Sequence, residues 1–217
     1  MNDCVLFLHG TYRAADLPFY KKLCIRKFLV AVDGGYTFFR KTGLLPDLLI
    51  GDFDSLGRKP SNLSPRTEVL TFPSDKDATD SEAALEYCLE RKTRRVDIVQ
   101  PSTGELDHLL GNLMLLTRAF KTRAARTKPK LRLINPCTEV RLVESESWSI
   151  RDAIGDTVSI VPFSKRVILS CRGTGYDVER LIVRQGETTG LRNRILAARA
   201  RFDIQGQAFF FHHIRRR

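Results

Sequence analysis

Short apolar runs that end in polar or glycine residues recur through the first part of the chain. Runs of this kind, bounded by turn residues, predict strands that are buried within a sheet. The predicted strands cover residues 5–8, 28–32, 48–50, 96–99 and 131–134. The polar motifs that follow them therefore stand at strand ends.

Helical periodicity lies between several of these strands. Residues 79–92 place Ala84, Leu85 and Cys88 on one face, which predicts an amphipathic helix. Residues 109–120 are more uniformly apolar and predict a buried helix. Strands that alternate with helices predict an α/β fold, with a mainly parallel sheet covered by helices on both faces. Such sheets bind ligands beyond the carboxyl ends of their strands.

The pattern changes near residue 140, after which short β-rich stretches alternate with glycines. These stretches cover residues 157–161, 166–169, 181–183 and 208–211. They predict a smaller C-terminal antiparallel β-sandwich. We therefore expect two domains, an α/β domain over residues 1–140 and a β-sandwich domain over residues 141–217.

The composition of the 217 residues, 42% hydrophobic and 28% charged, is typical of a soluble globular protein. No stretch approaches the roughly 20 continuous apolar residues of a membrane span, and the N-terminus lacks signal-peptide features. The five cysteines are scattered, which predicts structural thiols rather than disulfides or a zinc site. We expect a cytoplasmic protein.

The net charge of +11 raises the hypothesis of a nucleic-acid partner. The densest basic run, residues 118–132, contains no acid, but it lacks the interleaved aromatic residues of a single-strand binder. We therefore favour a solvated basic surface or a general attraction for an anionic substrate, with nucleic-acid binding as an alternative. Acidic residues are concentrated between Asp47 and Glu82, against the overall charge.

The first acidic motif, Gly51-Asp52-Phe53-Asp54-Ser55, follows a predicted strand. If the backbone stays extended there, the carboxylates of Asp52 and Asp54 leave one face and Phe53 packs on the other. Oxygen ligands that converge in this way suit Mg²⁺, which completes its coordination shell with water and substrate phosphates. Gly51 permits close backbone approach.

The second acidic motif immediately precedes the first predicted helix. Thr79 and Glu82 fit a capping box, so the helix dipole alone can explain an acid such as Asp80. Asp75 and Asp77 lie before the helix and lack that explanation. So many carboxylates would repel one another without a cation, and a divalent metal is therefore the expected partner.

Two more polar motifs follow predicted strands. Asp33-Gly34-Gly35 supplies a tight turn that is open to a ligand. Ser102-Thr103-Gly104, followed by Asp107-His108, adds hydroxyl groups, a flexible glycine and an Asp–His pair. Together these motifs predict an Mg²⁺-dependent enzyme that transfers a phosphate-containing group from a nucleotide to a small molecule.

Other metal- and phosphate-binding motifs fit less well. In a calcium EF-hand loop starting at Asp52, Leu56 and Leu63 would stand at ligand positions, which excludes that loop. The chain lacks a Walker A sequence and a Gly-x-Gly-x-x-Gly helix start. Asp52 also resembles the nucleophile of haloacid-dehalogenase-type phosphatases. That alternative is weaker, because their motif follows a first strand and continues with Gly-Thr.

The motifs together resemble those of the thiamine pyrophosphokinase family in order and spacing. They read Val32-Asp-Gly-Gly35, Pro46-Asp-Leu-Leu-Ile-Gly-Asp-Phe-Asp-Ser55, Asp75-Lys-Asp-Ala-Thr-Asp80 and Gly104-Glu-Leu-Asp-His108. The resemblance implies transfer of the diphosphate of ATP to the hydroxyl of thiamine, with release of AMP. It also implies a nucleotide-binding first domain and a thiamine-binding sandwich. The family works as a homodimer, with thiamine between one subunit's first domain and the partner's second.

The same resemblance implies roles for individual residues. The catalytic residues would be Asp52, Asp54, Asp77 and Asp80, of which Asp52, Asp54 and Asp80 would hold Mg²⁺. The nucleotide-binding residues would be Lys76, Ser102, Thr103, Gly104, Asp107 and His108. The substrate-binding residues would be Asp33, Gly34 and Gly35 at the thiamine and phosphate end, with Tyr176, Arg192 and Asn193 in the second domain.

The sequence departs from the family in three places. Lys76 stands where Gln is usual, Glu105 where Arg is usual, and Thr174-Gly-Tyr-Asp-Val178 is the nearest match to a thiamine-contacting motif. Because these changes affect the substrates more than the metal, a diphosphokinase for another hydroxymethyl acceptor, such as a pterin, stays an alternative. His212 and His213 are expected to be structural or at the surface.

Overall fold

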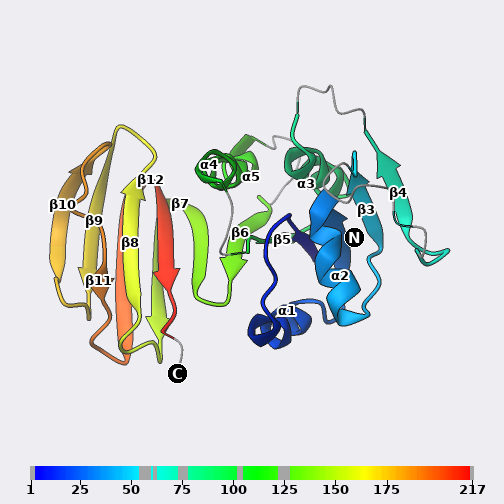
Figure 1. The fold of residues 1–217 in the computed structure, drawn as a ribbon. Coiled ribbons are helices and arrows are strands. Elements are labelled where there is room, and N and C mark those ends of the chain that lie inside the picture. The colour runs from blue at the N-terminus through cyan, green and yellow to red at the C-terminus, as the bar shows by residue number, and fades with distance from the viewer. Residues whose placement is uncertain are drawn as a thin grey trace. The chain divides into compact units, whose positions relative to one another are not determined.

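The computed structural model describes residues 3–53, 60, 63–72, 78–101, 105–121 and 128–215 (Figure 1). The chain divides into two compact units, Met1–Pro136 and Cys137–Arg217. Each unit has a hydrophobic core of its own. No helix in the described ranges is long and apolar enough to cross a membrane.

A parallel sheet forms the centre of the first unit. Its strands, in order across the sheet, are β6 (Lys130–Asn135), β5 (Arg95–Val99), β1 (Cys4–Phe7), β2 (Phe28–Val32), β3 (Leu48–Gly51) and β4 (Glu68–Thr71). Every neighbouring pair is parallel, so all carboxyl ends lie along one edge. The strand order reverses at β1, which has β2 on one side and β5 on the other. Ligands of such folds bind at this kind of reversal.

Helices connect the strands and cover both faces of this sheet. They are η1 (Ala14–Asp16), α1 (Leu17–Leu23), η2 (Asp33–Gly35), α2 (Tyr36–Thr42), α3 (Asp80–Glu90), α4 (Leu106–Leu115) and α5 (Arg118–Lys121), where η denotes a short 3₁₀ helix. On one face, Phe7 of β1 stacks on Phe38 of α2, with 4.1 Å between ring centroids, and Tyr20 of α1 packs against the same ring. On the other face, Cys4 of β1 and Cys88 of α3 are both fully buried. The predicted α/β fold is confirmed.

The second predicted helix, over residues 109–120, differs from the prediction in its length and in its burial. It is divided into α4 and α5, and the prediction that it is buried is wrong, because α4 exposes a row of large apolar side chains. These are Leu106, Leu109, Leu110 and Met114, with Leu106 83% exposed. The opposite side of the segment, with Leu115, Leu116 and Ala119, is buried. Apolar residues lie on both sides of this helix, and the first unit covers only one of these sides.

The second unit is an antiparallel sandwich, as predicted. Its strands are β7 (Thr138–Arg151), β8 (Thr157–Pro162), β9 (Arg166–Arg172), β10 (Val178–Arg184), β11 (Asn193–Arg194) and β12 (Arg199–His213). The long strands β7 and β12 pair with each other, with a register shift between Ile204 and Gln207. The other edge of β12 pairs first with β9 and then, beyond the shift, with β8. Trp148, Phe202 and Phe210 pack together in the core between the layers.

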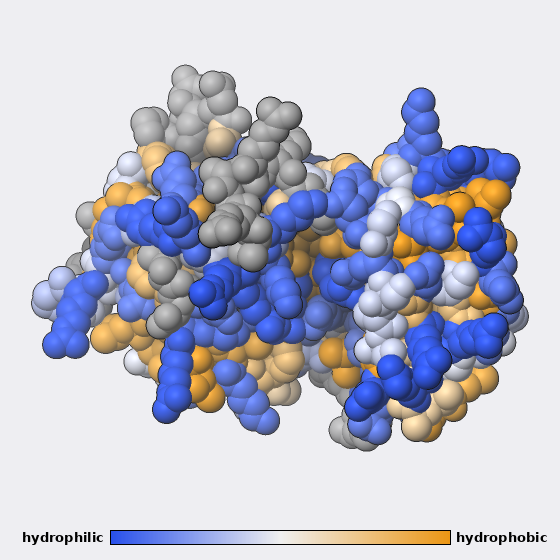
Figure 2. Space-filling view, turned by 180° about the vertical axis from the view of Figure 1, so that it is seen from behind, coloured by the Kyte–Doolittle hydropathy of each residue, from blue (hydrophilic) through white to orange (hydrophobic). Residues whose placement is uncertain are grey.

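Some residues of the basic run 118–132 form ion pairs within the first unit. Arg118 pairs with Glu82 and Glu86 of α3, and Arg132 pairs with the buried Asp97. Residues 122–127 lie outside the described residues. Hydrophilic side chains are spread over the visible face of both units (Figure 2). Two arginines of the run therefore form ion pairs within the first unit.

Candidate functional site

Three carboxylates converge at the carboxyl edge of the parallel sheet. Asp33 follows β2, Asp52 follows β3, and Asp80 begins α3, the helix that comes after β4. One oxygen of each lies within 4.8 Å of the other two, and all three side chains are half-buried. The parallel arrangement makes this convergence possible, because β2 and β3 are neighbours that end side by side.

Gly51 allows Asp33 and Asp52 to come together. A Cβ atom at position 51 would lie 3.0 Å from Cβ of Asp33 and 3.3 Å from its backbone nitrogen. The close backbone approach that Gly51 permits is therefore an approach to Asp33 of the same chain. Asp33 and Phe53 also have left-handed backbone angles, with φ of +44° and +66°. Such strained conformations of non-glycine residues are concentrated at functional sites.

The turn after β2 depends on glycine for a steric reason. A Cβ atom at Gly35 would lie 1.8 Å from the carbonyl oxygen of Phe7, the last residue of β1. Only glycine lets η2 pass over the end of β1 and hold Asp33 beside it. Gly34 and Gly35 are buried directly after Asp33. Gly35 thus positions the neighbouring carboxylate through the backbone.

The first turn of α3 selects which acid joins the cluster. Thr79 caps the helix, with its hydroxyl accepting the backbone N–H of Glu82 at 3.2 Å, as the capping-box pattern predicts. The Glu82 carboxylate itself pairs with Arg118. Asp80 lies on the side of Asp33 and Asp52. The helix dipole favours an acid here by about 0.3–1 kcal/mol, which offsets only part of the repulsion among three carboxylates.

The cluster has the properties of a cation site. Oδ1 of Asp33 is buried and has no hydrogen-bond partner among the described residues. A buried polar atom without a partner costs about 1–3 kcal/mol or more when charged. A divalent cation would supply that partner and would reduce the repulsion between the three side chains. Hard carboxylate oxygens are the ligands that Mg²⁺ prefers, so this donor set fits that ion.

The structure thus brings together Asp52 and Asp80, two of the three predicted Mg²⁺ ligands, and adds Asp33, which the sequence places at the substrate. No local pattern in the sequence places Asp33 in this cluster, because its position depends on the pairing of β2 with β3. The extended backbone expected after Asp52 is wrong at Phe53, whose φ is positive, although its ring is buried as expected. Six other predicted site residues lie outside the described ones: Asp54, Lys76, Asp77, Ser102, Thr103 and Gly104.

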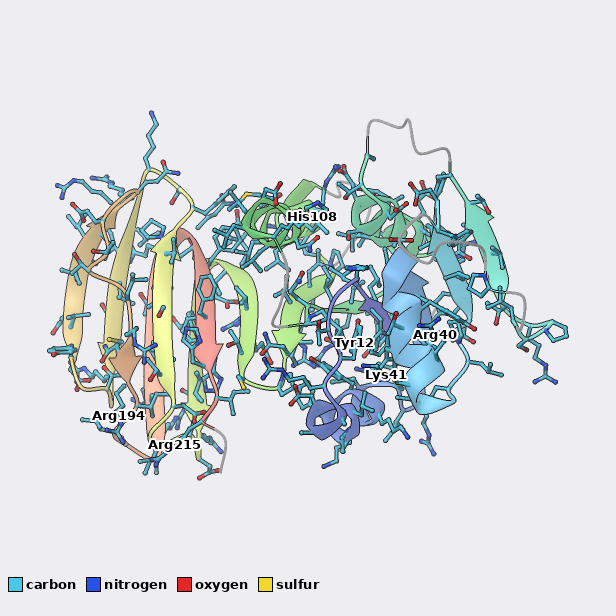
Figure 3. The ribbon with its side chains drawn as sticks, viewed as in Figure 1. Tyr12, Arg40, Lys41, His108, Arg194 and Arg215 are labelled. Atoms are coloured by element: carbon cyan, nitrogen blue, oxygen red, sulfur yellow. The ribbon has the colours of Figure 1, made fainter. Side chains whose placement is uncertain are left out.

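A second group of polar residues stands at the start of α4, after β5. Glu105, Asp107 and His108 have ligand atoms within 4.8 Å of one another, and all three are exposed. Nε2 of His108 lies 3.9 Å from Oε2 of Glu105. His108 projects from α4 in Figure 3. Because β5 is parallel to its neighbours, this group stands at the same edge of the sheet as the carboxylate cluster.

The predicted thiamine-contacting residues lie in two segments of the second unit, with Tyr176 in the loop between β9 and β10 and with Arg192 and Asn193 at the start of β11. Oδ1 of Asn193 accepts the backbone N–H of Tyr176 at 3.0 Å, and its Nδ2 donates to the Tyr176 carbonyl at 2.8 Å. The backbone N–H of Thr174 donates to Asp177, which holds the pKa of that carboxyl below its usual value. The Tyr176 side chain is thereby displayed to solvent, with the residue 76% exposed. Arg192 precedes Asn193 with a left-handed φ of +57°.

Fold and site define an α/β protein of two compact units, with a cluster of three carboxylates at the carboxyl edge of its parallel sheet. Residues 20–127 match the model of the thiamin pyrophosphokinase catalytic domain, and this segment contains Asp33, Asp52 and Asp80. The chain belongs to the thiamine pyrophosphokinase family.

Similar proteins come from bacteria and eukaryotes. Thiamine pyrophosphokinase of Bacillus subtilis (strain 168) is 28% identical over 181 residues, which cover 81% of each chain. Thiamin pyrophosphokinase 1 of Caenorhabditis elegans is 24% identical over 191 residues, 78% of this chain and 72% of its own. The crystal structure of a Bacillus subtilis thiamine pyrophosphokinase has a TM-score of 0.82 at 23% identity and covers all of both chains. These likenesses establish the shared fold.

Proposed function

We propose that this chain is an Mg²⁺-dependent thiamine pyrophosphokinase, which transfers the diphosphate of ATP to the hydroxyl of thiamine and releases AMP. One observation carries the proposal. Within the segment that matches the family's catalytic domain, one carboxylate oxygen each of Asp33, Asp52 and Asp80 lies within 4.8 Å of the other two, and Oδ1 of Asp33 has no hydrogen-bond partner among the described residues. This arrangement suits a cation that itself binds a polyphosphate.

Asp33, Asp52 and Asp80 would hold the Mg²⁺, with Asp54 and Asp77 contributing on the basis of the sequence. The bound ion would neutralise phosphate charge and help to orient the transferred group. The contribution of the chain is alignment. Its carboxylates are fixed at two strand ends and a helix N-terminus, which are rigid positions, and such preorganisation accounts for most of the catalysis in reactions of this type.

For ATP, we propose the polar residues after β5. Asp107 and His108 are exposed at the carboxyl edge of the sheet, where ligands of this fold class bind. Lys76 and the segment Ser102-Thr103-Gly104 complete this assignment from the sequence. Residues 1–140 would form the nucleotide-binding catalytic domain, and residues 141–217 the thiamine-binding domain.

For thiamine, we propose the surface loop that carries Tyr176, together with Arg192 and Asn193. The exposed aromatic ring can contact the cationic thiazolium ring of thiamine through its face. The hydrogen bonds of Asn193 fix the backbone of Tyr176, so the ring is presented from a defined position. This loop belongs to the second unit and the carboxylates to the first.

Replacing Tyr176 with Ala is expected to raise the KM for thiamine about 3- to 30-fold, which corresponds to the loss of a cation–π contact. The kcat and the KM for ATP should change little, because the carboxylates are untouched. Steady-state kinetics with each substrate varied in turn measures this split. Tyr176→Phe retains the ring face and serves as the matched control. An unchanged KM for thiamine in the Ala variant would place thiamine elsewhere.

We also propose a homodimer and a cytoplasmic location. The exposed apolar row on α4 supports self-association, because a contiguous apolar surface marks a contact site. The five cysteines are all free thiols, which suits a reducing compartment. A monomer in sedimentation equilibrium at micromolar concentration would contradict the dimer.

The function is tested by identifying the nucleotide product. Purified chain supplied with ATP, Mg²⁺ and thiamine is expected to yield AMP and thiamine diphosphate in equal amounts, and neither when thiamine is omitted or EDTA is added. ADP in place of AMP would rule out diphosphate transfer. AMP formed with a hydroxymethylpterin and not with thiamine would reassign the acceptor. Hydrolysis of simple phosphomonoesters without ATP would indicate a phosphatase.

A further inference from the structure

A groove crosses the outer face of three neighbouring strands in the second unit. It has a volume of about 760 Å³, which is within the range of small-molecule sites. Alternation along the strands directs every second side chain to this face. The outward residues are Ser147, Ser149 and Arg151 of β7, Arg199, Arg201 and Asp203 of β12, and Ser170 and Arg172 of β9. We call it the arginine groove.

Strand register places the arginines of this groove opposite one another. Arg199 on β12 pairs with Arg151 on β7, and Arg201 on β12 pairs with Arg172 on β9. Like charges at directly opposite positions destabilise a sheet. An arrangement with two such pairs on adjacent strands therefore needs a reason, and an anion in the groove would supply one.

The chain itself neutralises little of this charge. Asp203 is the one carboxylate among the described residues that line the groove, and it accepts a hydrogen bond from Ser147. Arg172 lies 3.7 Å from Glu179, but both side chains are more than three-quarters exposed, where such pairs contribute little. Arg199 donates to the hydroxyl of Ser149 at 3.2 Å. Four guanidinium groups thus share this face.

We infer that the arginine groove is a binding site for an oligophosphate, either free or as the phosphate chain of a nucleotide. Neighbouring strands are about 4.8 Å apart and alternate residues about 6.8 Å apart, so the four arginines are spread too widely for one phosphate. A chain of two or three phosphates can span them. Each guanidinium can bind phosphate oxygens through two parallel hydrogen bonds, and the lining serines offer further donors.

The experiment titrates the full chain with inorganic triphosphate by calorimetry, in EDTA and at about 0.15 M ionic strength, where the Debye length is about 8 Å. EDTA removes the divalent metal, so the carboxylate cluster does not contribute affinity for phosphate. We expect one triphosphate per chain. Arg201→Ala is expected to weaken binding about tenfold or more, because charge-assisted hydrogen bonds are lost. Asp52→Asn is expected to leave this affinity unchanged, which separates the groove from the carboxylate site.

Arg194→Ala is the matched control, since it removes the same charge from the same unit outside the groove (Figure 3). It should change the affinity by less than about twofold, as expected for a screened charge at a distance. Circular dichroism and urea midpoints verify that each variant folds. Equal affinity for ATP and triphosphate assigns the groove to the phosphate chain alone, and tighter ATP binding assigns it to a nucleotide.

Three results would overturn the inference. The first is absence of triphosphate binding, and the second is equal binding by wild type and Arg201→Ala. If Arg194→Ala weakened binding as much as Arg201→Ala does, the affinity would reflect general charge attraction rather than the groove, and the inference would fail for the same reason. The third is tighter binding of a single-stranded DNA oligomer, by about a hundredfold over triphosphate, that is lost in the Arg201→Ala variant. That result would assign the groove to nucleic acid.

Discussion

Replacing Asp52 with Asn is expected to lower the kcat of AMP formation by about 10²- to 10³-fold, the usual cost of removing one preorganised electrostatic group. The amide has the shape of the carboxylate but no charge, so it weakens the cation site while the strand end keeps its geometry. Wild type should gain thermal stability on addition of Mg²⁺, because the ion binds only the folded chain, and the variant should gain much less. Product assays and thermal melts measure the two effects independently.

Glu90→Gln is the matched control, since it removes a carboxylate from the exposed last residue of α3, at the far end of the helix from Asp80. It is expected to retain kcat and the response to Mg²⁺. Asp33→Asn tests whether Asp33 is a ligand, and it should lose the thermal response as Asp52→Asn does. Near-normal turnover together with a normal Mg²⁺ response in Asp52→Asn would place the metal elsewhere.

The largest effect on stability is expected at Asp97, which is fully buried in β5. Its carboxylate forms ion pairs with Nζ of Lys27 at 2.6 Å, with Nε of Arg95 at 3.0 Å and with Nε of Arg132 at 2.5 Å. Asp97→Asn would leave three cations around a neutral amide, and breaking a buried ion pair in this way costs about 3–5 kcal/mol. Urea denaturation at neutral pH measures the change. Glu179→Gln, which breaks the exposed pair with Arg172, should cost less than about 1 kcal/mol.

The contribution of Asp97 is expected to depend on pH. Burial acts to raise the pKa of Asp97, but hydrogen bonds from Arg132 and Lys27 and the charges of Arg132 and Arg95 lower it to about 2. Between its ordinary pKa and this value, the unfolded chain binds the proton more readily than the folded chain. The stabilisation is therefore complete above about pH 4 and is lost as the pH falls toward 2. A stability difference between wild type and Asp97→Asn that stays constant down to pH 2 would contradict this.

Much of the fold could be predicted because burial leaves a direct pattern in the sequence. The strands β1, β2, β3, β5 and β6 are apolar runs because both of their faces are covered, and the predicted runs lie within a residue of the observed bounds. β4, β7 and β11 were not predicted, and only part of β12 was. β7 exposes alternate polar residues, as at Ser145 and Ser147, so its apolar pattern is diluted. α4 shows the opposite error, since its apolar composition predicted burial and did not reveal which side would be covered.

The candidate site was partly predictable for a similar reason. Asp52 and Asp80 stand in motifs with a recognisable spacing, and each motif follows a strand or begins a helix. Asp33 could not be placed in this cluster from the sequence, because its position depends on the pairing of β2 with β3 and on the close approach at Gly51. The arginine groove left no local pattern at all, since its residues come from strands far apart in the chain and meet only through register.

By itself, the sequence determined the order of strands and helices, the acidic motifs at their ends and the family to which the chain is similar. These properties depend on neighbours along the chain, through burial, helix capping and turn chemistry. Only the tertiary structure decided which side chains lie together: the third carboxylate of the acidic cluster, the three cations around the buried Asp97 and the facing arginines. Strand pairing joins residues that are distant in sequence, and no local pattern encodes the register in which they meet.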